Sequence, residues 1–140
     1  MKFDTSFTVP GKTPEACFDY ITDPDHGTEW AGSAKEVRAE GDPGVGRKII
    51  AKVNMILDFE ITQTVTTFDR PTRYVFSATS PMKVAYDFRL EAAGEGTRVS
   101  CDLDADPGKF IPGGSLLLKG KFKKEFNNDM ASLEKALANL

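Results

Sequence analysis

Histidine, cysteine and long apolar runs are all scarce in this sequence of 140 residues. It has one histidine, His26, and two cysteines, Cys17 and Cys101, with no CxxC pair. A zinc centre therefore has too few of its usual ligands, and both cysteines are expected to be buried, small apolar side chains. A catalytic triad or a Cys–His pair would have to use His26, which stands in an acidic segment typical of a surface loop. No catalytic residue, metal or cofactor is expected.

The sequence also lacks any apolar stretch long enough to cross a bilayer. The longest runs, 53–57 and 115–118, fall far short of the roughly 20 residues that a spanning helix needs. The first residues show no secretory signal, so a cytoplasmic location is expected. With 18 Lys or Arg against 21 Asp or Glu and a pI near 5.2, nucleic acid is not an expected partner. The length indicates a single domain over residues 1–140.

Proline and glycine divide the chain into recognisable helices and strands. Alternation from Phe3 to Val9 predicts a first strand, and Thr13-Pro14 predicts the start of a helix that runs to about Thr22. A second small helix or turn is expected over 25–33. Strands are then predicted over 35–40, 47–57, 57–68, 73–80, 83–92 and 98–105. Connections this short make neighbouring strands antiparallel.

One long helix is predicted at the end of the chain, beginning between Pro112 and Leu117. Its apolar residues recur every three or four positions: Leu118, Phe122, Phe126, Met130, Leu133, Leu137 and Leu140. A helix of about 25 residues is roughly 37 Å long, so it must lie across the sheet. The predicted fold class is α+β: a curved antiparallel sheet of six or seven strands wrapped around the C-terminal helix, with two short helices after the first strand.

Four segments carry a resemblance to a known superfamily. They are TDPDHGTEWAGSAKEVRAEGDPGVGRKI (22–49), DRPTRYVFSATSP (69–81), GEGTRVS (94–100) and ASLEKALANL (131–140). Through them the sequence resembles the START-like helix-grip superfamily (SRPBCC), and most of all its bacterial polyketide cyclase/dehydrase and lipid-transport proteins. These motifs mark positions in the fold and not chemistry. The resemblance implies lipid binding, polyketide cyclisation or assistance to chaperones, without choosing among them.

The alternation of side chains along the predicted strands indicates which ones face the long helix. Because the apolar set of each strand must point inward, the interior of the sheet contains no Asp, Glu, Lys, Arg or His, and binding is favoured over acid–base catalysis. The residues expected to line a ligand cavity are Trp30, Phe59, Ile61, Gln63, Tyr74, Phe76, Tyr86, Phe88, Cys101, Phe122, Phe126 and Met130. For each aromatic residue a purely structural role in the core is the alternative. Trp30 is expected near the entrance, as a lid or as a ligand contact.

Three functions stay open on this basis. The first is the binding or transport of a hydrophobic small molecule, such as a lipid or a polyketide-like compound. The second is a polyketide cyclase or aromatase, which would hold a reactive chain in the shape it needs to cyclise. The absence of an interior acid or base argues against this second function. The third is a co-chaperone-like interaction module, for which no exposed apolar face is evident.

Four lysines, Lys119, Lys121, Lys123 and Lys124, flank the apolar stripe where the long helix starts, after Gly113-Gly114 as a hinge. An anionic membrane attracts such a charged rim by about 1 kcal/mol per lysine. Weak, salt-sensitive contact with a membrane surface is therefore one expectation. The alternative is that the lysines only keep the helix solvated. No oligomeric state is favoured by the sequence.

Overall fold

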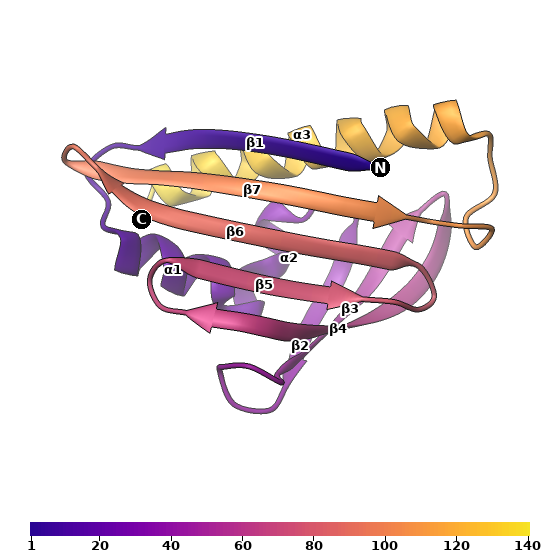
Figure 1. The fold of residues 1–140 in the computed structure, drawn as a ribbon, viewed down its shortest axis with the longest axis horizontal. Coiled ribbons are helices and arrows are strands. Elements are labelled where there is room, and N and C mark those ends of the chain that lie inside the picture. The colour runs from indigo at the N-terminus through magenta and orange to yellow at the C-terminus, as the bar shows by residue number, and fades with distance from the viewer.

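The computed structural model describes residues 1–140 as a seven-stranded antiparallel sheet with its helices on one face (Figure 1). The strands are β1 (Lys2–Val9), β2 (Ala34–Glu40), β3 (Lys48–Met55), β4 (Leu57–Asp69), β5 (Arg73–Ala78), β6 (Lys83–Ala93) and β7 (Gly96–Asp106). The helices are α1 (Pro14–Thr22), the short 3-10 helix η1 (Pro24–His26), α2 (Gly27–Trp30) and α3 (Ser115–Ala138). The predicted α+β helix-grip architecture is confirmed.

The strands follow one another in the sheet in the order β1-β7-β6-β5-β4-β3-β2. Only β1 leaves the sequential order: it pairs with β7 from Lys2↔Asp104 to Val9↔Thr97. The predicted strand boundaries hold to within two residues. At the β3–β4 turn, Ile56 adopts a φ of 67°, and this left-handed conformation lets the chain reverse so that Met55 pairs with Leu57. The sheet curves, and β2 and β3 turn behind it in Figure 1.

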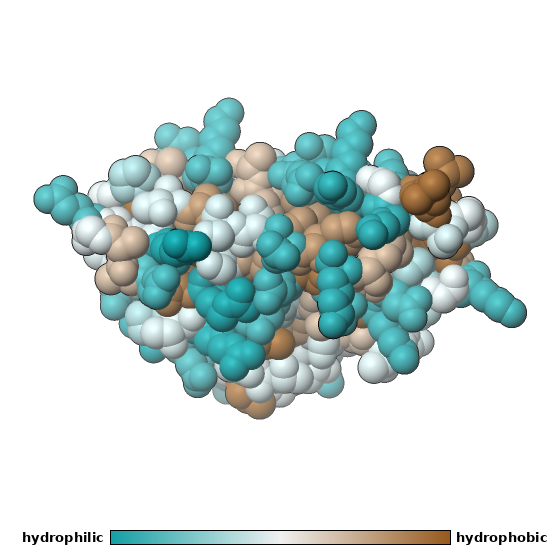
Figure 2. All heavy atoms as spheres, turned by 45° about the horizontal axis from the view of Figure 1, so that its top comes forward, coloured by the Kyte–Doolittle hydropathy of each residue, from teal (hydrophilic) through white to brown (hydrophobic).

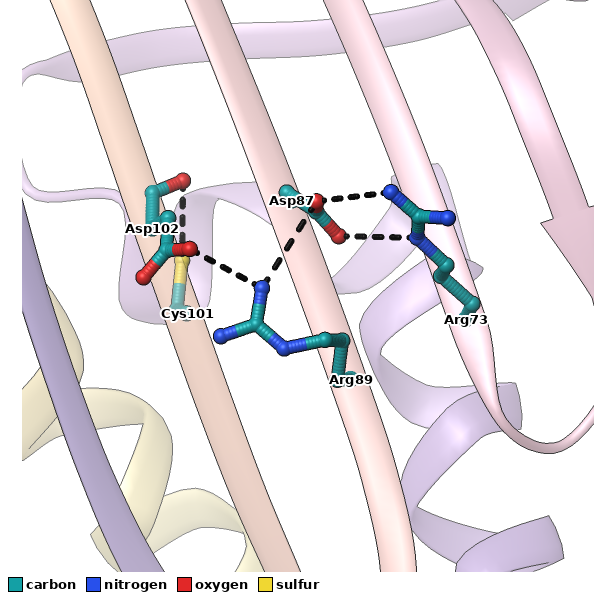
Figure 3. Close-up of polar contacts among 5 residues, drawn as sticks. All are labelled: Arg73, Asp87, Arg89, Cys101 and Asp102. Atoms are coloured by element: carbon teal, nitrogen blue, oxygen red, sulfur yellow. Dashed lines mark hydrogen bonds and ion pairs between the residues drawn. The ribbon is translucent and has the colours of Figure 1, made fainter.

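The outer face of the sheet carries ion pairs between neighbouring strands. Figure 3 shows Asp87 of β6 between Arg73 and Arg89, with nitrogen–oxygen distances of 3.0 and 3.6 Å. Arg89 also reaches Asp102 of β7 at 2.9 Å. Exposed pairs of this kind contribute little to stability individually. They mark the outer face of the sheet: Cys101, beside Asp102 in the sequence, faces the interior and is fully buried.

The start of α1 follows from two adjacent residues. The Thr13 hydroxyl accepts a hydrogen bond from the Ala16 backbone N–H at 3.1 Å, and Pro14 occupies the first turn, where a missing N–H has no consequence. The helix turns Phe18 onto the sheet, where its ring meets Phe68 edge-on with centroids 5.2 Å apart. The predicted helix, including its first and last residues, is confirmed.

A close approach between α2 and β2 positions the tryptophan of α2. A Cβ on Gly27 would lie 2.9 to 3.0 Å from the side chain of Val37, so only glycine allows α2 to pack this tightly against the strand. The helix then directs Trp30 inward, where its ring stands perpendicular to that of Phe88 at 5.9 Å. Trp30 is 7% exposed and belongs to the interior.

The long helix α3 begins at Ser115, inside the predicted interval, and packs against β1 and α2. Its predicted stripe is buried at Leu118, Phe122, Phe126, Met130, Leu133 and Leu137. The inclusion of Leu140 in this stripe is wrong: the helix ends at Ala138, and Leu140 is 46% exposed. Cys17 and Cys101 are free and buried, as predicted. None of the helices has both the length and the apolar character required to span a membrane.

Candidate functional site

A cavity of about 140 Å³ lies between the inner face of the sheet, α2 and α3. Of the 28 residues that line it, 20 are hydrophobic. They come from strands β2 to β7 and from the segments around α1, η1 and α2, while α3 closes the opposite side. An apolar cavity of similar volume admits a benzene-sized molecule in other proteins. This cavity can therefore enclose one ring-sized apolar group, and because it is open on one side a longer molecule can extend outward from it.

Most of the residues predicted from strand alternation do line the cavity. The structure places on its wall Trp30, Phe59, Ile61, Gln63, Tyr74, Phe76, Tyr86, Phe122 and Phe126. Side chains of one strand parity share a face of the sheet, and that face is the one covered by α3. The aromatic rings form a continuous surface: the Phe76 ring lies 5.0 Å from Tyr86 and 5.1 Å from Tyr74, measured between centroids.

Three predicted lining residues do not reach the cavity. Phe88 and Cys101 are fully buried, and Met130 is 3% exposed, but none of them belongs to the wall. Phe88 points to the inner face as predicted, where the ring of Trp30 stands against it. Strand alternation predicts which face of the sheet a side chain is on. It does not predict whether an inward side chain reaches the cavity or is covered by other core residues. These three residues belong to the packed core.

The cavity wall contains acidic residues that the sequence reasoning missed. Asp129 of α3 is 6% exposed, and it lines the cavity together with Glu125 and Asp23. The predicted absence of an interior acid is therefore wrong, because that reasoning considered the strands and not the helix. The spacing along the helix does predict that Asp129 is buried. Position 129 follows Phe126 by three residues and precedes Leu133 by four, so it lies on the apolar stripe.

Asp129 is held by one hydrogen bond and sits in apolar surroundings. Its Oδ1 accepts the backbone N–H of Gly32 at 2.8 Å, which ties α3 to the segment after α2. Burial raises the pKa of Asp129 to about 7; the nearby charge of Glu125 acts in the same direction, and the Gly32 hydrogen bond opposes both. Near neutral pH, Asp129 can therefore both accept and donate a proton.

Apart from its three acidic residues, the wall carries neutral polar groups. Burial raises the pKa of Tyr74 to about 12, and burial together with the charge of Asp129 raises the pKa of Tyr86. The hydroxyls of both residues and the Gln63 amide form no side-chain hydrogen bond within the protein. The Nε1–H of Trp30 is buried and has no acceptor. These groups remain available to a bound molecule.

The one histidine of the chain lies outside the cavity wall. His26, in η1, stacks on the ring of Tyr20 with centroids 4.4 Å apart, and its Nδ1 contacts Oε2 of Glu29. Its Nε2 is 3.8 Å from a carboxylate oxygen of Asp23. No group of three or more His, Cys, Asp or Glu side chains is arranged to hold a metal ion. The charged side chains that line the cavity are the carboxyl groups of Asp23, Glu125 and Asp129.

A curved antiparallel sheet, a long helix across it and an apolar cavity between them define a START-like helix-grip domain. The chain belongs to the polyketide cyclase / dehydrase and lipid transport family, whose sequence model matches residues 1–138. Among curated proteins, none matches this chain.

Solved structures with the same fold cover nearly the whole chain. A Thermus thermophilus protein, TTHA0849, is 15% identical with a TM-score of 0.81, covering 98% of this chain and 97% of its own. A START superfamily protein from Mycobacterium smegmatis is 14% identical with a TM-score of 0.79, covering 99% and 97%. The di-domain ARO/CYC StfQ of the steffimycin biosynthetic pathway is 13% identical with a TM-score of 0.73, covering 99% of this chain and 50% of its own. At these identities the likeness concerns the fold.

Proposed function

We propose that this protein binds a hydrophobic small molecule, a lipid or a polyketide-like compound, in the cavity between the sheet and α3. The observation that carries the proposal is the wall itself, with 20 hydrophobic residues among 28. A concave, mostly apolar site with a few polar groups is the usual form of a small-molecule site. Membership of a family described by both lipid transport and polyketide cyclisation supports the same ligand class.

A fluorescent probe tests this proposal through the one tryptophan of the chain, which lines the cavity. N-phenyl-1-naphthylamine, a neutral dye that brightens in apolar surroundings, is expected to bind and to receive excitation energy from Trp30. Ala51 faces the cavity from β3. The variant Ala51→Phe places a ring in the free space, so it is expected to weaken dye binding by roughly tenfold or more.

The matched control places the same ring on the other side of the same strand. Lys52 is exposed on the outer face and pairs with Glu36 at 3.3 Å, so Lys52→Phe is expected to leave dye binding unchanged. Circular dichroism confirms that both variants are folded. Equal dye binding by wild type, Ala51→Phe and Lys52→Phe would locate the dye elsewhere and would contradict the proposed cavity site.

Chemistry on the bound molecule is a second candidate function, and Asp129 is the observation that favours it. A carboxyl group with a pKa of about 7 inside an apolar cavity can take a proton from a ligand and return it, as a cyclase or dehydrase requires. The two candidates differ in the mass of what is released. A carrier returns the molecule that it took up, whereas dehydrative cyclisation returns a product lighter by one water.

Contact with a membrane surface is a further part of the proposed function, as a route for loading the cavity. Leu116 and Leu117, in the first turn of α3, are 84% and 78% exposed. Figure 2 shows a strongly hydrophobic protrusion at the end of the molecule where α3 begins. The residues that follow include four exposed lysines, Lys119, Lys121, Lys123 and Lys124. Apolar side chains beside lysines are typical of helices that lie on anionic membranes.

Co-sedimentation with vesicles tests this contact. Binding to anionic vesicles at low salt is expected to exceed binding to neutral ones, and replacement of the four lysines with Gln is expected to remove up to about 4 kcal/mol of docking free energy. Leu116→Ser with Leu117→Ser is expected to weaken docking as well. The control replaces four exposed lysines of the sheet with Gln: Lys2, Lys48, Lys52 and Lys83. Equal binding to both vesicle types, or equal loss in the control, would leave the lysines of α3 a solubilising role only.

A further inference from the structure

The charged groups on the cavity wall are all acidic. Asp23, Glu125 and Asp129 line the cavity, and no Lys, Arg or His does. Asp129 is 6% exposed, whereas the Asp23 side chain is 41% exposed and Glu125 pairs with Lys121 at 3.6 Å. A negatively charged ligand would therefore meet its main repulsion at Asp129, where water screens charge poorly. A neutral or positively charged ligand meets no such repulsion, so the wall discriminates by charge as well as by hydrophobicity.

Asp129 has one carboxylate oxygen engaged and one free. Oδ1 receives the Gly32 N–H at 2.8 Å, and no protein group donates a hydrogen bond to Oδ2. The residue is only 6% exposed and lines the cavity. The second carboxylate oxygen is thus an acceptor on the cavity wall with no partner in the protein, and a donor carried by a ligand can bind to it.

Trp30 supplies the complementary observation from α2. Its Nε1–H is buried without any acceptor, the residue is 7% exposed, and it lines the same cavity. The segment after α2 is bonded to Asp129 through Gly32, so the two unsatisfied groups belong to the α2–α3 side of the wall. One side of the cavity thus offers a free acceptor and a free donor, while the strands offer aromatic rings.

We propose that the cavity selects an apolar molecule that is neutral or positively charged and carries a hydroxyl or an ammonium group, whose hydrogen is received by the free oxygen of Asp129. An oxygen on the same ligand would accept the Nε1–H of Trp30. This selection rests on the proposed binding function and names its substrate class. Ligands whose only polar group is a carboxylate, such as fatty acids, are disfavoured by the buried charge of Asp129.

Four benzene derivatives that differ only in their polar group test this ligand selectivity. Each is assayed at pH 8 for its ability to displace N-phenyl-1-naphthylamine. Toluene has no polar group, benzyl alcohol a neutral donor, benzylammonium a cationic donor, and phenylacetate a negative charge. The alcohol and the ammonium ion are expected to displace the dye at concentrations at least about tenfold lower than phenylacetate. Comparison of the two donors shows whether a neutral or a cationic group is preferred.

Substitution of the carboxylate assigns the effect to Asp129. Asp129→Asn is expected to weaken benzylammonium about tenfold or more, to strengthen phenylacetate and to leave toluene unchanged. Glu134→Gln, at an exposed acid of the same helix, is expected to change none of them. Equal displacement by benzylammonium and phenylacetate, or an equal effect of Asp129→Asn on every compound, would overturn the selection. Absence of dye binding altogether would instead count against the proposed binding function.

Discussion

Replacing Asp129 with asparagine is expected to stabilise the fold, and to do so more strongly at high pH. The gain in the free energy of unfolding should grow by about 2 to 3 kcal/mol between pH 5 and pH 8. Asparagine has nearly the same shape as aspartate and keeps an oxygen for the Gly32 N–H, but it cannot acquire a buried negative charge. Urea unfolding of both proteins at the two pH values measures the difference.

The direction follows from the pKa of Asp129 in the two states. Burial raises this pKa from 3.8 to about 7 in the folded protein, so between these values the folded state binds more protons than the unfolded state. The stability of the wild type therefore falls as the pH rises from about 4, and the full penalty is present above pH 7. The asparagine variant has no such dependence at this position.

Neighbouring groups have to be held constant in this comparison. Glu125 on α3, Tyr86 on β6 and Asp23 after α1 lie on the same cavity wall, and they are present in both proteins. Glu134→Gln, which removes an exposed acid from the same helix, should show no comparable growth with pH. A variant less stable than wild type at pH 8, or a difference that does not change with pH, would be incompatible with a buried, destabilising carboxylate.

Truncation of Phe88 to alanine is expected to lower the free energy of unfolding by about 3 to 5 kcal/mol. The side chain is fully buried, and its ring packs against Trp30 at 5.9 Å, Tyr86 at 6.3 Å and Phe76 at 6.4 Å. Removing it deletes the support beneath the cavity wall and leaves a void in close-packed surroundings. Thermal and urea unfolding report this loss.

Phe59 is the matched comparison on the cavity wall. It is only half-buried and lies on the surface of the cavity, with Phe110 at 5.1 Å. Phe59→Ala is therefore expected to destabilise the fold by less than half as much as Phe88→Ala, while weakening dye binding. If Phe59→Ala proved the more destabilising change, the division of the inward aromatics into core and wall would be wrong.

Alternation and helical spacing were sufficient to predict the fold and much of the cavity wall. Glu60 and Ile61 are adjacent in the sequence, yet one is exposed on the outer face and the other lines the cavity, because the side chains of a strand alternate between two environments. Thr13 and Pro14 gave the start of α1 for an equally local reason, since a cap depends on a few neighbouring residues.

Which inward residues reach the cavity, and the surroundings of its acidic residues, could not be predicted from alternation and helical spacing. Phe88 and Tyr86 share a face of β6, yet Tyr86 lines the cavity whereas Phe88 does not and instead packs against Trp30 of α2. Helical spacing could have placed Asp129 on the buried stripe, but not its surroundings in the cavity: its hydrogen-bond donor Gly32 is 97 positions away. Such contacts exist only once α2 and α3 have packed against each other.

Native mass spectrometry of the protein purified from its own cells tests most directly whether the cavity holds a hydrophobic small molecule. We expect a fraction of the protein to carry added mass that an organic solvent releases, and we expect Ala51→Phe from the same cells to lack it. Protein stripped by solvent should regain a small molecule when it is mixed with an apolar extract of those cells. An unmodified mass in both proteins, together with no uptake from the extract, would contradict a ligand-binding role for this cavity.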